Sequence, residues 1–119
     1  MEIGSQQPDR LTRGDIRQWN NALNEVCNGY QVANFQAAIG ISEQAAEDFL
    51  KKVHSLSPDE PAVFPLEELL AIRNALTAVL AELDPAEFHA RTGVTVEESR
   101  QMRNFLDELT GQMRFVKTA

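Results

Sequence analysis

The chain has 119 residues, of which 43% are hydrophobic and 24% are charged, and its net charge at pH 7 is −7. No apolar run approaches the roughly 18 residues of a membrane span, and a single cysteine excludes an internal disulfide framework, so we expect a cytoplasmic protein without a secretory signal. The acidic field repels nucleic acid and anionic lipid, which leaves a basic protein partner or simple solubility as its role.

The first predicted element is a long helix over residues 13–29. Thr12 precedes it as a candidate N-cap, and Asn28 and Gly29 form a natural stop. Its apolar residues recur at intervals of three and four, the spacing of one helix face. They are Ile16, Trp19, Leu23, Val26, Cys27 and Tyr30.

A short helix and a third helix follow. The pattern indicates a helix over residues 32–39, then a turn at Gly40, since glycine adopts a positive φ without a Cβ penalty. Ser42 is a candidate N-cap for the third helix, which presents Phe49 and Val53 on its apolar side. No segment of the chain shows the alternation of a strand.

Residues 57–63 read as a linker, because two prolines favour an extended or turned backbone there. The second long helix opens at Phe64-Pro65 and stops at Asp84-Pro85. It is apolar nearly all round, which predicts either a central position or a contact with another chain.

The last predicted elements repeat the earlier order. A short helix spans residues 85–91, Gly93 makes the turn, and Thr95 with Glu98 has the spacing of a capping box for a third helix. The tail, residues 110–119, could fold back to cover the second long helix.

A shift of 53 positions places residues 11–56, the first half, on residues 64–109, the second half, without a gap. The match has 9 identities in 46 pairs, where average residue usage gives roughly three. We therefore predict an internal duplication. A half of this size is too small to be stable alone, so we expect one all-α domain over residues 1–119, with about six helices in two pseudo-symmetric three-helix units around a shared core.

Asparagine occupies the same helix-interior position in both halves, at Asn21 and Asn74. It is a poor residue for a helix interior, because its amide competes for backbone hydrogen bonds. Either the two amides meet where the long helices cross and set the register of the halves, or each faces solvent. We assign these residues, together with Gly40 and Gly93, a structural role.

The short helix, glycine turn and capped helix resemble the helix-turn-helix of DNA-binding proteins. The first copy reads Phe35-x-Ala37-x-Ile39-Gly40-Ile41-Ser42, and the second reads Phe88-x-Ala90-x-Thr92-Gly93-Val94-Thr95. The resemblance implies that the following helix enters the major groove. The exposed positions of that helix would then include several carboxylates, which phosphates repel. DNA binding is therefore the second hypothesis for function.

No catalytic pattern stands out. Cys27 aligns with Leu80, which indicates a small core residue rather than a nucleophile. The sequence lacks a serine–histidine–aspartate order, a phosphate-binding loop and a cluster of metal-ligand spacing. We expect no enzyme activity, cofactor or metal; a carboxylate-based enzyme is a distant third hypothesis.

The first hypothesis is a non-catalytic, acidic protein-interaction module, such as a small regulator or inhibitor of the antitoxin or immunity-protein kind. Its carboxylates would meet a basic surface on the partner protein. The candidate partner-binding residues stand at the starts of the two third helices: Glu43, Glu47, Asp48, Glu97 and Glu98.

A homodimer is a further possibility. Leu70 and Ala78 are apolar where the first half has Arg17 and Glu25. A polar face thus becomes apolar in the second half, which fits either burial within the domain or an oligomer interface.

Overall fold

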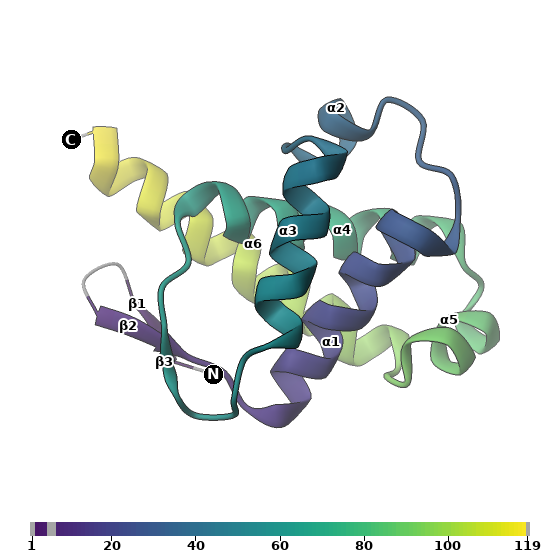
Figure 1. Cartoon of the computed structure of the whole chain (residues 1–119), viewed down its shortest axis with the longest axis horizontal. Coiled ribbons are helices and arrows are strands. Elements are labelled where there is room, and N and C mark those ends of the chain that lie inside the picture. The colour runs from purple at the N-terminus through teal and green to yellow at the C-terminus, as the bar shows by residue number, and fades with distance from the viewer. Residues whose placement is uncertain (1, 5–6, 119) are drawn as a thin grey trace.

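Figure 1 shows the computed structural model, which describes the backbone of residues 2–4 and 7–118 and the side chains of residues 11–112. The described chain is mostly helical, which confirms the all-α class. Its helices are α1 (Arg13–Asn24), the π-helical η1 (Glu25–Gly29), α2 (Phe35–Ile39), α3 (Glu43–His54), α4 (Leu66–Glu82), α5 (Pro85–Thr92) and α6 (Val96–Thr118). None of these helices combines the length and hydropathy needed to cross a bilayer.

The first long helix begins where the sequence predicts. The Thr12 hydroxyl accepts from the Asp15 amide at 3.1 Å, and the Asp15 carboxylate accepts from the Thr12 amide at 3.0 Å, which completes a capping box. The helix does not end as a regular α-helix, because α1 continues directly into η1. The change to a π turn was not predicted, and it involves a contact with α5 described below.

The two short helices differ in length. α5 starts at Pro85, where the Asp84 side chain accepts from the Glu87 amide at 2.8 Å. α2 starts only at Phe35, after Asn34 in a left-handed conformation, so the predicted helix over residues 32–39 is three residues too long. The first half lacks the Asp-Pro pair that starts a helix early in the second.

Both glycine turns adopt the expected conformation. Gly40 has φ 99° and Gly93 has φ 78°, in the left-handed region. Ser42 then caps α3 through the Ala45 amide, and Thr95 pairs with Glu98 at the start of α6. The corners between the second and third helices of each half therefore follow directly from local sequence.

Three short strands were not predicted. β1 (Glu2–Gly4) pairs antiparallel with β2 (Gln7–Arg10), and β2 pairs with β3 (Pro61–Ala62) inside the expected linker. Strands of two to four residues are too short to show a period, and one pairing joins segments far apart in sequence.

The tail does not fold back. α6 runs unbroken to Thr118, so the predicted tail over residues 110–119 is in large part the continuation of the third helix. Within it, the buried Thr110 hydroxyl donates to the Leu106 carbonyl at 2.7 Å, one turn earlier. The prediction that the tail folds back to cover the second long helix is therefore wrong.

The buried apolar residues of both halves form one core cluster. Trp19 in α1 is fully buried, stacks edge-on against Phe64 with 5.1 Å between ring centroids, and donates from its indole nitrogen to the sulfur of Met102 in α6 at 3.5 Å. α4 supplies the largest group of buried helix residues: Leu69, Ala71, Ile72, Ala75, Leu76 and Val79.

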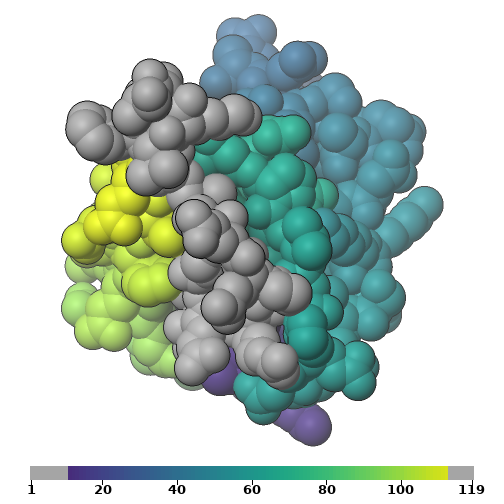
Figure 2. Space-filling model, turned by 90° about the vertical axis from the view of Figure 1, so that its left-hand side faces the viewer, coloured from purple at the N-terminus to yellow at the C-terminus, as the bar shows by residue number. Residues whose placement is uncertain are grey.

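The helices pack both within and across the halves. α1 packs on α3 and α4 packs on α6, each within one half. In contrast, α2 packs on α4 and α5 packs on α1, so each short helix contacts the long helix of the opposite half. Figure 2 shows parts of α4 and α6 reaching the same face of the molecule.

Candidate functional site

The two asparagines occupy matching positions across the halves. The Asn74 amide nitrogen donates to the Ile39 carbonyl at 2.8 Å, and the Asn21 amide nitrogen donates to the Thr92 carbonyl. Ile39 and Thr92 are the last residues of α2 and α5, whose terminal carbonyls lack partners within their own helices. Each long helix thus caps the short helix of the opposite half.

This arrangement differs from both expectations for the asparagines. The amides do not bond to each other, and neither simply faces solvent, since both side chains are half-buried and bonded to backbone. Their spacing along the chain is matched by that of their acceptors, because Ile39 and Thr92 are also 53 residues apart.

The glycines stand beside these amides. A Cβ on Gly40 would lie 3.3 Å from the Asn74 amide nitrogen, and a Cβ on Gly93 would lie 4.0 Å from that of Asn21. Gly40 therefore meets two requirements, a positive φ and close approach of the opposite helix.

Three of the predicted partner-binding carboxylates share one helix. We call Glu43, Glu47 and Asp48 the acidic face of α3; all three are exposed. Among the described residues, none of the ion pairs involves them. Within the described part of the chain, the hydrogen bond that Asp48 accepts comes from a neutral side chain, that of Gln44, at 3.2 Å.

Cys27, at the end of the first long helix, lies within electrostatic reach of this face. Burial, then the charges of Glu47 and Glu43, raise the pKa of the Cys27 thiol to about 11. The thiol is therefore protonated at neutral pH, which agrees with a packing residue rather than a nucleophile.

Glu97 and Glu98 lie apart from the acidic face of α3. They stand at the start of α6, which is well separated in Figure 1 from the start of α3. The Glu98 carboxylate accepts from the Thr95 amide at 3.1 Å, and Glu97 accepts from Gln101 at 3.4 Å. The five predicted residues thus do not form one surface.

The candidate oligomer residues Leu70 and Ala78 are both half-buried within the monomer. On the same helix Ala71 is fully buried and Ala81 is exposed. The apolar side of α4 is thus covered only in part by the chain itself, and the homodimer stays a prediction.

The sequence did not predict an ion pair between a buried carboxylate and a more exposed arginine. Arg91 in α5 binds Glu25 in η1 with 2.5 Å between guanidinium nitrogen and carboxylate oxygen, and donates to the Gly29 carbonyl at 3.0 Å. Glu25 is only 6% exposed. A side chain at Gly29 would collide with the Glu25 carboxylate, so this glycine makes room for the pair.

Arg91 also binds Glu87 one turn earlier, at 3.1 Å. The hydrogen bond to Glu87 and the pairing with Glu25 raise the pKa of the Arg91 guanidinium, against a lowering by burial. Because η1 supplies both Glu25 and the Gly29 carbonyl, Arg91 holds the π turn against α5.

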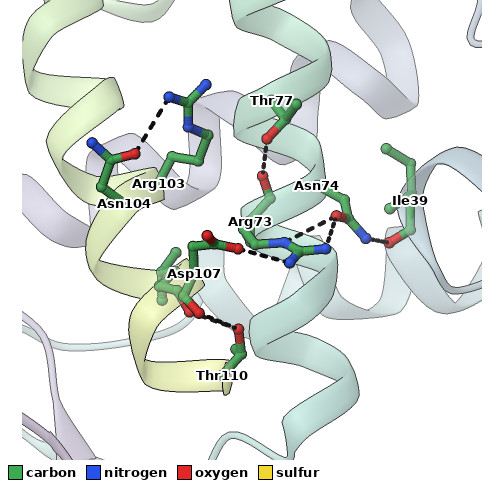
Figure 3. Close-up of polar contacts among 9 residues, drawn as sticks. Ile39, Arg73, Asn74, Thr77, Arg103, Asn104, Asp107 and Thr110 are labelled. Atoms are coloured by element: carbon green, nitrogen blue, oxygen red, sulfur yellow. Dashed lines mark hydrogen bonds and ion pairs between the residues drawn. The ribbon is translucent and has the colours of Figure 1, made fainter. Parts of the chain in front are cut away.

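A polar hollow between α4 and α6 is the second feature that the sequence did not reveal. It has a volume of about 390 Å³. Its lining, which Figure 3 shows, comes from both helices: Arg73, Asn74, Thr77, Arg103, Asn104 and Asp107. We call it the α4–α6 hollow. A pattern of apolar spacing cannot find such a site, because its residues belong to the polar sides of two helices.

Within the described part of the chain, no group of three or more His, Cys, Asp or Glu side chains is placed to hold a metal ion. Comparison of the chain with models of known protein families, with curated proteins and with solved structures found no match. The function is therefore argued from the chain's own surfaces.

Proposed function

We propose that this protein is a non-catalytic binding module whose acidic face of α3 docks on a basic surface of a partner protein. The carrying observation is the state of Glu43, Glu47 and Asp48, which are exposed and take part in none of the ion pairs among the described residues. Carboxylates that take part in no ion pair among the described residues are available to a cationic surface, which they attract at long range.

The proposal includes the finer architecture. The two halves are equivalent three-helix units about a pseudo-twofold axis, in one domain with a shared core. The reciprocal contacts of Asn21 with Thr92 and of Asn74 with Ile39 support it, as does the packing of each short helix on the opposite long helix. In this core α3 packs on α1, and a helix already held by packing suits docking without rearrangement.

The test measures association with the partner after the charges of the acidic face of α3 are removed. The chain is used to capture proteins from a nuclease-treated cell extract, and association with the captured protein is then measured at several salt concentrations. The variant Glu43→Gln/Glu47→Gln/Asp48→Asn should slow association about tenfold at low salt and flatten its salt dependence, while the melting temperature stays nearly unchanged.

The matched control neutralises three exposed carboxylates outside the candidate partner-binding residues, as Glu67→Gln/Glu82→Gln/Glu108→Gln. It makes the same change in net charge, so an equal loss in both variants would mean that overall charge, rather than the acidic face, drives binding. Sequence-selective binding of duplex DNA by the unmodified protein at physiological salt would favour the helix-turn-helix hypothesis instead.

A further inference from the structure

The α4–α6 hollow contains one arginine that is held in place by its neighbours. The Arg73 guanidinium binds the Asp107 carboxylate at 2.9 Å and the Asn74 amide oxygen at 2.8 and 3.2 Å (Figure 3). Asn74 is itself bonded to the Ile39 carbonyl at 2.8 Å. Arg73 is therefore positioned before any ligand arrives, so little side-chain entropy is lost when one binds.

Arg103, the second arginine of the hollow, forms no ion pair with any carboxylate among the described residues. Asp107 lies one turn after Arg103 on α6, the usual spacing for a helical ion pair, but it binds Arg73 instead. Arg103 is half-buried, and its one hydrogen bond among those of the described residues is to the neutral side chain of Asn104, at 3.3 Å. In a chain with 18 acidic and 11 basic residues, a half-buried arginine without a carboxylate partner is a cation left available.

The first half shows that the fold does not require these charges. Arg73, Arg103 and Asp107 correspond to Asn20, Leu50 and His54 in the repeat. The first half has these uncharged or weakly basic residues in its helices, and α1 still packs on α3. The second half has the charged residues, and α4 packs on α6. The charged set thus belongs to the second half alone and is not a condition for packing the two helices.

We propose that the α4–α6 hollow binds a single carboxylate group, with Arg103 as its direct partner and Arg73 as the second donor. Two arginines and one aspartate leave the hollow with a net charge of +1, which one carboxylate neutralises. The planar fork of a guanidinium matches the two oxygens of that group. A phosphate dianion would leave excess negative charge, in a molecule that already carries −7.

The site is tested by nuclear magnetic resonance of the arginine Nε–H groups in the full chain. Sodium acetate is titrated at constant ionic strength against chloride, and inorganic phosphate at about pH 8, where the dianion predominates, serves as the competing oxyanion. We expect saturable shifts at Arg103 and Arg73, with acetate bound more tightly than phosphate.

Two variants on α6, Arg103→Gln and Arg100→Gln, distinguish binding in the hollow from a general effect of positive charge. Arg103→Gln should weaken acetate binding about tenfold, the value of one charge-assisted contact. Arg100→Gln removes an exposed arginine that does not line the hollow, and it should leave binding within about twofold. Asp107→Asn raises the charge of the hollow to +2 and should shift its preference toward phosphate.

A blocked peptide, acetyl-Ala-Glu-Ala-amide, distinguishes the two sources of the carboxylate. Binding at least about tenfold tighter than acetate assigns the site to an acidic side chain of a protein, and equal or weaker binding assigns it to a free organic acid. The proposal is overturned by unsaturable shifts, by equal losses in the Arg103 and Arg100 variants, or by phosphate binding more tightly than acetate to the unmodified chain.

Discussion

Two of the polar contacts that join the halves differ in one respect: the first is present on both sides and the second on a single side. Asn74 caps α2 and Asn21 caps α5, so this contact occurs twice. The pair of Glu25 with Arg91 occurs once, because the corresponding positions, Ala78 and Ala38, are alanines. The repeated contact uses neutral groups that satisfy helix ends, whereas the single contact buries charge. The repeated contact joins the halves at two places, whereas the charge pair takes one residue from each half and joins them at one place.

The largest effect is expected when the two halves are produced as separate fragments. Fragments 1–58 and 59–119 should each show little helical circular dichroism alone, because each short helix loses the opposite long helix and each half exposes its side of the core. An equimolar mixture should recover the helical signal. Cooperative melting of either fragment alone as a monomer would refute the dependence of one half on the other.

The next test concerns the single-sided charge pair. Arg91→Ala leaves the carboxylate of Glu25 buried without a cation and should lower the melting temperature strongly. The double variant Glu25→Ala/Arg91→Ala copies the alanines of the other side and should lower it by less than half as much. Thermal melts of both variants measure this. A double variant as unstable as Arg91→Ala would show that the two sides are not equivalent in packing.

The double-sided contact predicts two similar losses. Asn21→Ala and Asn74→Ala each leave a terminal helix carbonyl without its donor, at a cost of about 1–3 kcal/mol in unfolding free energy. Asn74 also holds Arg73, so its loss should be the larger. Urea unfolding provides the values, with the exposed Asn28→Ala as the control near zero. An effect at only one of the two asparagines would break the equivalence.

The apolar excess of α4 is tested by restoring the first half's residue type. Leu70 is half-buried and corresponds to the exposed Arg17, so Leu70→Arg should keep the fold. If the protein is a homodimer through this face, light scattering should show a shift from dimer to monomer. A cooperative loss of folding without any change in mass would place Leu70 in the interior of the monomer.

The last test concerns Cys27, which stands where the second half has Leu80 and for which the effect of a variant is expected to be small. Its pKa is raised from 9.0 to about 11, mainly by burial. At pH 8 the thiolate fraction is therefore about 100-fold below that of a free thiol of the ordinary pKa, and alkylation should be slow in proportion. Glu47→Gln removes one charge that raises this pKa and should speed alkylation slightly, whereas Glu67→Gln should not.

Local sequence was sufficient for much of the fold. The caps at Thr12, Ser42 and Thr95 and the turns at Gly40 and Gly93 are decided by neighbouring residues, and they were predicted correctly. The helical spacing likewise located the long and third helices, because one side of each packs on the core.

Contacts between distant residues account for what was missed. The repeat showed that Asn21 corresponds to Asn74. It could not show that the partner of Asn74 is the end of α2 and not the side chain of Asn21. The π turn is in contact with Arg91, which lies 66 positions after Glu25. In the α4–α6 hollow, Asp107 forms its ion pair with Arg73 on the other helix and not with Arg103, four residues before it. The sequence alone does not decide between these two arginines.

The exchange of short helices between the halves has a consequence for how such a protein can change. Two separate chains of one repeat would make the same exchange only as a dimer, at a concentration that allows association, whereas the linker makes the association intramolecular. In a dimer of identical chains, every substitution appears on both sides of the axis. In one chain with the proposed duplication it appears once, so Arg91 can bind Glu25 on one side while alanines remain on the other. Joining the two halves in one chain thus allows a residue on one side to change alone. The contacts of each short helix with the opposite long helix can stay the same.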